Sequence, residues 1–279
     1  MHAEAVSRTV GIVAGNGTLP TEIAEAVTAS GRRPFIVAIA DEAEDAVNRF
    51  DHERLDWGRF GNLFKVLERE DARDVVFAGG VRRRPNLRLR HLDWTTVKAV
   101  PSLLVMLMSG DDGILSGLAR MFEERGFAMR GVGDVAPELL LDEDLGRVSA
   151  TAREQIALGT GIVRALGPFD VGQGAVVCGK RAVAVEGLEG TDSMLERVER
   201  LRDEGRLKDD RDGVLVKVPK PGQDRRMDLP AIGPRTVLRA RAAGLRGIAG
   251  EAGGMVVLER ERTRTLAREH GLFLHVIRS

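Results

Sequence analysis

The sequence predicts an α/β protein with two domains, the first built on a parallel sheet with helices on both faces and the second of mixed α/β structure. Short apolar runs alternate with helix-spaced segments through the first half, which is typical of a doubly wound parallel sheet. Glycines follow two of these runs, where strands are expected to turn into helices. Near 131–144 the pattern changes to a connection that contains proline and acidic residues. We therefore place the domains at 1–135 and 136–279.

The elements of the first domain follow from its apolar pattern. The first strand is expected at 10–14, an apolar run that ends at Gly15-Asn16-Gly17, and apolar residues at helical spacing then predict a helix up to Gly31. The buried run PFIVAIA predicts a second strand. The remaining elements are a helix at 60–70, a strand at 75–78, a helix at 94–108 and a helix that Asp112 caps and that continues to Gly126.

The second domain is expected to mix helices with short strands. Ser193 and Glu196 have the spacing of a capping box, so we expect a helix to start there, with Asp192 complementing its dipole. The other elements are a helix at 151–166, strands at 174–178, 182–185 and 214–218, a helix at 235–243, and a strand–helix–strand unit between 255 and 277.

Composition excludes several classes of protein. Hydrophobic residues make up 43% of the 279 residues, enough for a normal core, and 42 basic residues balance 42 acidic ones, so no nucleic-acid partner is expected. A single cysteine, Cys178, excludes an internal disulfide and a cysteine-built zinc site. We find no signal peptide and no apolar run of membrane-spanning length, so we expect a cytoplasmic protein that can still lie on a membrane surface.

Two glycine-containing turns are candidates for binding a phosphate. Gly15, Asn16 and Gly17 sit where a strand turns into a helix, so backbone N–H groups and the helix N-terminus can hold an anion there. The loop is not GxGxxG, yet with Asp41 after the second strand it leaves a nicotinamide-binding role open. A tight turn that merely requires glycine explains the loop equally well.

The second turn, Gly79-Gly80, closes the third strand at the same carboxyl edge of the sheet. An arginine cluster at 82–84, including Arg83, follows it and can bind a diphosphate or an anionic membrane surface. A solvated loop is the alternative for any single arginine of this cluster.

Two polar stretches of the second half are candidates for catalysis. Residues 186–192 place carboxylates and a glycine directly before a helix. Residues 217–234 gather lysine, glutamine, aspartate and arginine in a Pro/Gly-rich loop between a strand and a helix. Such a loop can bind a metal ion or a water nucleophile and neutralise phosphate charge, so a functional role is favoured over a connecting one.

Several segments together resemble the UDP-2,3-diacylglucosamine pyrophosphatases of the LpxI type, from lipid A biosynthesis in Gram-negative bacteria. They are GIVAGNGTLP (11–20), FAGGVRRRPN (77–86), GDDGILSGLARMFEERGF (110–127), DVGQGAVVCGKRAVAVEGLEGTD (170–192), KVPKPGQDRRMDLPAIGPRTV (217–237) and AGLRGIAGEAGGMVVLER (243–260). The resemblance implies a Rossmann-like nucleotide-binding domain, a catalytic C-terminal domain and an active site at their interface. It implies hydrolysis of the diphosphate to UMP and 2,3-diacylglucosamine 1-phosphate (lipid X), with water attacking the phosphorus on the sugar side.

The resemblance also implies site residues and partners. Asp224 and Asp228 match the catalytic positions, with Asp224 the first choice, and together with Asp192 they are the expected ligands of Mg²⁺ or Mn²⁺. The expected substrate-binding residues are Gly15, Asn16, Gly17, Gly79, Gly80, Arg83, Gln173, Lys180, Glu189, Gly190, Thr191, Lys220, Gln223 and Arg225. A lipid substrate implies transient contact with the inner membrane, and a homodimer is expected from the prevalence of two-fold oligomers. Two alternatives stay open, an NAD(P)-dependent oxidoreductase and a non-catalytic nucleotide-binding module.

Overall fold

The chain is described by a computed structural model that covers residues 8–56, 60–80, 110–207 and 212–278. It divides into two compact units. The first contains Met1–Glu138 together with Arg226–Asp228, and the second contains Leu139–Arg225 and Leu229–Ser279. The predicted helix at 94–108 and the predicted substrate-binding Arg83 lie outside the described residues.

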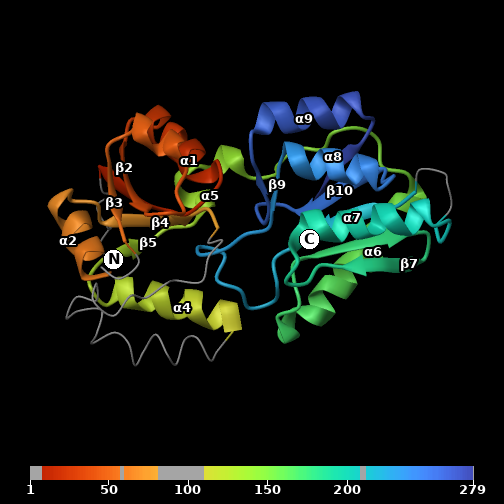
Figure 1. Ribbon diagram of the computed structural model, residues 1–279, viewed down its shortest axis with the longest axis horizontal. Helices are drawn as coiled ribbons and strands as arrows, with labels where there is room; N and C mark the ends of the chain where they lie inside the picture. Colours follow the sequence, from red (N-terminus) through yellow and green to blue (C-terminus); the bar gives the residue numbers. More distant parts are fainter. Residues whose placement is uncertain (1–7, 57–59, 81–109, 208–211, 279) are drawn as a thin grey trace. The chain divides into compact units, whose positions relative to one another are not determined.

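The first unit contains a five-stranded, fully parallel sheet with strand order β3-β2-β1-β4-β5 (Figure 1). The strands are β1 (Thr9–Ala14), β2 (Arg33–Ile39), β3 (His52–Leu55), β4 (Asp74–Ala78) and β5 (Ala128–Met129). The predicted parallel sheet is confirmed. Sequence reasoning missed β3 and β5 because both are short edge strands with almost no apolar alternation.

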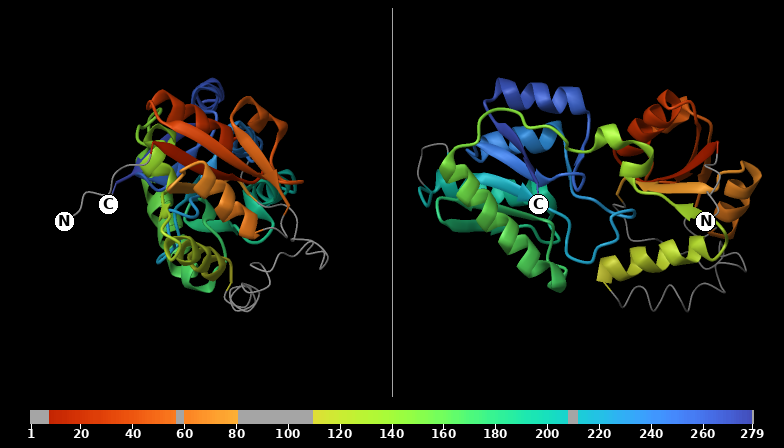
Figure 2. Two further views of the ribbon diagram at one scale, coloured as in Figure 1. Left: turned by 90° about the vertical axis from the view of Figure 1, so that its left-hand side faces the viewer. Right: turned by 180° about the vertical axis from the view of Figure 1, so that it is seen from behind.

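Helices cover both faces of this sheet, as the alternating side chains of β2 require. Phe35, Val37 and Ile39 pack in one cluster with side chains of α2 and α4, while Ile36 and Ala38 point to the other face, where α1 packs. Figures 1 and 2 show α1 on one side of the sheet and α4 on the other. The helices are α1 (Leu19–Ala29), α2 (Phe60–Arg69), α4 (Gly110–Glu123) and α5 (Val132–Val135), with 3₁₀ turns η1 (Asp45–Arg49) and η3 (Pro137–Leu139). Because α4 already includes Gly110, Asp112 lies inside the helix, and its predicted capping role is wrong.

The second unit contains a mixed five-stranded sheet with order β12-β10-β8-β6-β7. Strands β12, β10 and β8 are parallel, and β6 is antiparallel to both of its neighbours, which confirms the predicted mixed α/β structure. The strands are β6 (Gly174–Cys178), β7 (Arg181–Val185), β8 (Val214–Lys217), β10 (Gly247–Glu251) and β12 (Phe273–Ile277), with a separate small parallel pair of β9 (Ala231–Ile232) and β11 (Val256–Val257).

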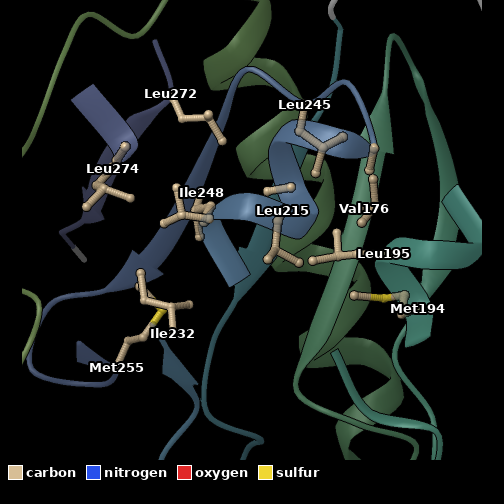
Figure 3. Close-up of a cluster of buried hydrophobic side chains, with 14 of the residues drawn as sticks. Val176, Met194, Leu195, Leu215, Ile232, Leu245, Ile248, Met255, Leu272 and Leu274 are labelled. Carbon is tan, nitrogen blue, oxygen red and sulfur yellow. The ribbon is translucent and has the colours of Figure 1, made fainter. Parts of the chain in front are cut away.

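The core of the second unit forms two layers around the sheet. Helix α6 packs on one face, and α7, α8 and α9 pack on the other. Figure 3 shows the larger layer, in which Val176, Leu215 and Ile248 of the strands meet Met194 and Leu195 of α7. The helices are α6 (Ala150–Leu166), α7 (Gly190–Asp203), α8 (Pro234–Ala242) and α9 (Arg260–Glu269), with a 3₁₀ turn η4 (Gly167–Phe169).

Two sequence expectations for the second unit are corrected. Helix α7 begins at Gly190, three residues before the expected start, so Ser193 lies inside the helix and the predicted capping box does not form, while Asp192 does lie in the first turn. Strand β10 was missed because its sequence is glycine-rich. A Cβ at Gly247 would lie 2.4 Å from the Phe273 ring, so packing in this unit requires that glycine inside a strand.

No helix in the described part of the chain is both long and apolar enough to cross a bilayer.

Candidate functional site

In the first unit, the two glycine turns meet at the carboxyl edge of the sheet. Gly15 follows β1 and Gly79-Gly80 follows β4, and these neighbouring strands lie at the point where the strand order reverses. Open α/β sheets bind their ligands at this kind of switch point. The Asn16 N–H donates to the Gly80 carbonyl at 2.8 Å, the Gly80 N–H donates to the Asn16 carbonyl at 3.2 Å, and the Asn16 side-chain amide donates to the Gly80 carbonyl at 2.8 Å.

Glycine is required at both turns for a steric reason. A Cβ at Gly15 would lie 2.2 Å from the Gly80 carbonyl oxygen, and one at Gly79 would lie 2.3 Å from the Asn16 carbonyl oxygen. Gly79 and Gly17 also have positive φ angles, +85° and +91°. Around Gly17, however, a Cβ would meet nothing within 4 Å, so its backbone faces open space. The two predicted turns therefore form one hydrogen-bonded edge, with open space beside half-buried Gly17.

In the second unit, a buried polar triad lies at the carboxyl end of β8. Lys217, the last residue of that strand, is 5% exposed, and its Nζ donates to Thr191 Oγ1 at 2.6 Å and to the Ala231 carbonyl at 3.3 Å. Thr191 Oγ1 donates in turn to Glu186 Oε1 at 2.5 Å, and Lys217 Nζ lies 3.7 Å from that same carboxylate oxygen. The triad of Lys217, Thr191 and Glu186 thus joins β8, the first turn of α7 and the segment after β7.

One carboxylate oxygen of this triad has no partner. Glu186 is 8% exposed, and its Oε2 is buried without a hydrogen-bond partner in the part of the chain that the structure describes. Gly172 and Gly174 make room for this residue, since a Cβ at Gly174 would lie 2.6 Å from Oε2 and one at Gly172 would lie 2.2 Å from the Glu186 carbonyl oxygen. A buried carboxylate oxygen without a partner lowers the stability of the folded state. Its presence therefore favours a functional role for Glu186 over a purely structural one.

A second set of polar contacts holds the loop that follows β8. Buried Lys220 forms an ion pair with Asp170, and the Lys220 N–H donates to Gln223 Oε1 at 3.0 Å. Arg225 Nη2 lies 2.7 Å from an oxygen of Glu251, the last residue of β10. The start of the 217–234 loop is therefore anchored to the carboxyl edge of the second sheet by two ion pairs, in which Lys220 is buried and Arg225 is exposed.

Comparison with known proteins places this arrangement in a family. Residues 9–139 match the model of the LpxI N-terminal domain, and residues 145–275 match the model of the LpxI C-terminal domain. Over 271 residues the chain is 40% identical to the UDP-2,3-diacylglucosamine pyrophosphatase LpxI of Caulobacter vibrioides, and the match covers 96% of each chain. This chain belongs to the LpxI family. Membership argues against the nicotinamide-dependent oxidoreductase alternative.

Most of the site residues expected for an LpxI protein in the second unit lie at one edge of its sheet. Gln173 precedes Gly174, which pairs with Lys217, and Gly190 and Thr191 begin α7 at the same edge. Lys220 and Gln223 follow β8 there.

Lys180 is the exception among these residues. It lies in the turn between β6 and β7, and Gly179 beside it donates to Asp212, which precedes β8. Because β6 runs antiparallel to β8, this turn lies at the opposite edge of the sheet.

Two other acidic residues expected in the LpxI site are engaged in ion pairs. Asp192 lies 2.7 Å from Arg235 at the start of α8, and Glu189 lies 3.0 Å from Arg197 within α7. Among the described residues no group of three or more histidine, cysteine, aspartate or glutamate side chains is gathered to hold a metal ion. A preformed three-carboxylate cage is therefore not part of the described chain.

The two expected catalytic aspartates belong to different units. Asp224 is counted with the second unit, whereas Asp228 is counted with the first, together with Met227. Met227 is 7% exposed and packs in the apolar cluster of the first unit, and Arg226 lies 2.7 Å from Glu123 of α4. Both aspartates are half-buried. The segment from 226 to 228 is thus held in the first unit by one apolar and one ionic anchor.

Sequence reasoning did not select Lys217 or Glu186 as site residues. Each appears only as an ordinary member of a polar stretch, and they are brought together because Gly174 pairs with Lys217 while Glu186 follows the antiparallel partner of β6. One signal was available. Strand β8 reads VLVK, and a lysine that ends a fully buried strand must find a polar partner at the sheet edge.

Proposed function

We propose that this chain hydrolyses UDP-2,3-diacylglucosamine to UMP and 2,3-diacylglucosamine 1-phosphate, a step of lipid A biosynthesis. The 40% identity over 96% of both chains to an enzyme that bears this activity in its name supports the proposal most strongly. Water forms a bond to the phosphorus on the sugar side, the bond from that phosphorus to the bridging oxygen breaks, and UMP leaves. The water oxygen therefore remains on the sugar 1-phosphate.

In this proposal the second unit neutralises the charge of the diphosphate. Lys217 is a buried cation at the end of β8, and the first turn of α7 begins beside it with Gly190 and Thr191. A buried ammonium group and a helix N-terminus are both suited to phosphate oxygens in a water-poor site. Glu186 holds the Thr191 hydroxyl group and balances the Lys217 charge before substrate binds. Lys217 therefore binds phosphate oxygens, and Glu186 positions Lys217 and Thr191.

The first unit binds the nucleotide part. The Gly15–Gly17 turn and the Gly79-Gly80 turn present backbone groups at the switch point of a parallel sheet, without side chains that would keep a ligand away. Asn16 is fixed there by its side-chain bond to the Gly80 carbonyl. This edge suits close approach of a ligand to the backbone.

Asp224 and Asp228 orient the attacking water and accept its proton. Their carboxylates are also the donors that a hard cation prefers, and Mg²⁺ takes one or two protein carboxylates together with substrate phosphate oxygens. The absence of a three-carboxylate group among the described residues is compatible with this mode of binding, and Asp192 is already paired with Arg235. We assign Asp224 and Asp228 to hold Mg²⁺ or Mn²⁺, which when bound neutralises charge on the diphosphate.

Exposed apolar side chains near the carboxyl edge of the second sheet suit a lipid substrate. Phe169 and Leu188 are 77% and 101% exposed, and they flank the polar edge from the segments before β6 and after β7. Single exposed apolar residues are ordinary, but two on neighbouring loops beside a buried charged site favour contact with acyl chains or with the membrane that holds them.

A homodimer is also proposed, and analytical ultracentrifugation of the purified chain would test it.

Hydrolysis by the purified chain tests this function. With UDP-2,3-diacylglucosamine in detergent micelles and H₂¹⁸O, we expect UMP without label and a labelled sugar 1-phosphate, and we expect chelation of divalent metal to abolish the reaction. Asp224→Asn and Asp228→Asn should each lower kcat by roughly 10²–10⁴-fold, the usual contribution of a general base. Asp203→Asn, an exposed change in α7, is the matched control and should retain activity.

The outcomes separate the possible roles. Absence of hydrolysis under every metal condition would reject the enzyme function in favour of a nucleotide-binding module. Full activity in both aspartate variants would reject the catalytic assignment while leaving the reaction in place. Label in UMP instead of the lipid product would show that water attacks the other phosphorus, the one that remains in UMP.

A further inference from the structure

A cavity of about 690 Å³ lies in the second unit at the edge opposite the polar triad. Arg246 and Phe273, which line it, stand at the amino-terminal ends of β10 and β12, whereas Lys217 and Glu251 stand at the carboxyl ends of the parallel strands. A five-residue strand spans roughly 13–16 Å, so the cavity and the triad are separate places on the same sheet. Its volume lies within the range of about 300–1,000 Å³ that small-molecule sites occupy.

The charged side chains that line this cavity are all arginines. Arg147, Arg246 and Arg268 line it from three different segments of the chain, and none of the described residues that line it is acidic. Guanidinium groups bind phosphate oxygens through paired N–H donors, and three of them around one space suit an anion with several oxygens. The cavity therefore favours a phosphate over a neutral ligand.

Two further features of its walls agree with this ligand class. Ser149, the N-cap of the 17-residue helix α6, lines the cavity, so the positive end of that helix dipole lies at it. Gly146 and Gly271 supply stretches of wall without side chains, and both have positive φ angles, +76° and +61°. Buried Phe273 adds an apolar floor, which suits an organic substituent on the phosphate.

We infer that this arginine-lined cavity is a second binding site of the chain, specific for a phosphate group carried by a small organic molecule or by a lipid headgroup. The site is independent of the hydrolytic reaction, because none of its lining residues belongs to the polar edge described above. The exposed Phe169 and Leu188 mark the other edge of the sheet, so a membrane that meets those loops would not reach the cavity. The geometry thus favours a soluble phosphate compound.

Binding measurements on the full chain test the site without any substrate. One variant, Arg147→Gln/Arg246→Gln/Arg268→Gln, removes the cavity charge. The control variant, Arg181→Gln/Arg200→Gln/Arg241→Gln, removes three exposed arginines elsewhere in the same unit. Calorimetric titration with inorganic phosphate at constant ionic strength is the first probe, and co-sedimentation with phosphatidylcholine vesicles that contain phosphatidylglycerol is the second. Circular dichroism verifies that both variants are folded.

Loss of about tenfold or more in phosphate affinity in the cavity variant, with the control unchanged, would support a site for a soluble phosphate compound. Loss of vesicle binding in the cavity variant alone would support the site with a lipid headgroup as its ligand. Arg268→Lys should be intermediate, since lysine keeps the charge but not the paired donors. If the cavity variant and the control behave alike with both probes, or if the wild type binds neither, the inference is wrong. None of these readouts depends on hydrolysis, so the failure of this site and the failure of the proposed reaction are distinguishable.

Discussion

Two buried carboxylates illustrate how the two units differ, one at the amino-terminal edge of the first sheet and one at the carboxyl edge of the second. Asp74 begins β4 in the first unit and is 3% exposed; Arg32 binds one of its oxygens, and Arg130 Nε lies 2.9 Å from the other. Glu186 follows β7 in the second unit and is 8% exposed, but only its Oε1 is bonded while its Oε2 has no partner among the described residues. The two carboxylates are thus similarly buried, but among the described residues only Asp74 has partners for both of its oxygens.

The difference separates a structural role from a functional one. A buried carboxylate with both oxygens paired to arginine resembles a stabilising feature, whose removal leaves buried charge behind. A buried carboxylate that is half satisfied, beside a buried lysine at the carboxyl edge of a sheet, keeps capacity for another molecule. If this comparison is right, changes at the Glu186 edge should affect activity more than folding, and changes at Asp74 should do the reverse.

Within this comparison of sheet edges, the largest expected effect concerns the lysine of the triad. Lys217→Met should lower kcat/KM by about 10²–10³-fold, because it removes a buried cation expected to stabilise charge on the diphosphate. Lys180→Met should change kcat/KM by less than about twofold, since Lys180 lies at the opposite edge of the sheet. Steady-state hydrolysis of UDP-2,3-diacylglucosamine by the two variants measures both values. Equal losses in the two variants would show that edge placement does not identify the site.

A matched pair of amide substitutions tests the comparison directly. Asp74→Asn should lower the free energy of unfolding by about 3 kcal/mol, because it leaves Arg32 and Arg130 without their buried counter-charge, and kcat/KM per folded molecule should stay within about twofold. Glu186→Gln should lower kcat/KM by about tenfold or more and lower the free energy of unfolding by about 1 kcal/mol. The reason is that it mainly weakens the hydrogen bond that the Thr191 hydroxyl group donates to residue 186.

Urea denaturation with two signals measures this pair. Circular dichroism follows the unfolding of both units, and hydrolysis of UDP-2,3-diacylglucosamine at each urea concentration follows the loss of activity. A large activity loss in Asp74→Asn, or a large stability loss in Glu186→Gln with normal activity, would reverse the assignment of roles.

The sequence predicted the regular parts of both units because those parts have regular signals. Strand β1 and helix α1 have clear apolar periodicity, and Gly15 and Gly79 mark turns whose meeting follows from parallel strand order. Strand β10 carries no such signal, because Gly247 and Gly250 leave space for the side chains of Phe273 and Met255. Its place between β8 and β12 is a property of tertiary packing.

The candidate site was predictable to the extent that it lies in continuous polar segments. Thr191, Lys220 and Gln223 fall in such segments and do lie at one edge of the second sheet. The contact of Lys217 with Glu186 depends on the register of three strands, which periodicity does not give. Lys180 is the opposite case. It lies close in sequence to the other candidate residues, but the β6–β7 hairpin reverses direction at Lys180 and so places it at the other edge of the sheet.

A smaller effect is expected at the backbone of the glycine edge. Gly79→Ala should cost about 2 kcal/mol or more, since it combines a positive φ angle with a Cβ 2.3 Å from the Asn16 carbonyl oxygen. Gly17→Ala has a similar φ angle but open space around it, so it should cost only about 1 kcal/mol. Circular dichroism during urea unfolding compares the two. Equal costs would mean that the contact between the two turns is not tight.

The smallest expected effect concerns Cys178, a half-buried titratable group on β6 at the edge away from Glu186. Burial raises the pKa of its thiol from 9.0 to about 11, and Sγ lies 3.4 Å from the Asp212 carbonyl. Because the pKa is higher in the folded state, this group contributes stability below pH 9, and the contribution is lost as pH rises from 9 to about 11. Iodoacetamide at pH 9 should therefore alkylate the native chain about fiftyfold more slowly than the urea-unfolded chain, since the thiolate is the reactive form.

Cys178→Ala isolates this titration from that of lysine and arginine in the same pH range. The difference in unfolding free energy between wild type and Cys178→Ala should shrink steadily above pH 9, because only the wild type gains protons on its thiol by folding. A difference that is constant from pH 8 to 11, together with fast alkylation of the native chain, would mean that the thiol is solvated. In that case the burial of a group would not be enough to tell the two edges of the second sheet apart. The functional role of Glu186 would then be supported only by its carboxylate oxygen that has no partner among the described residues.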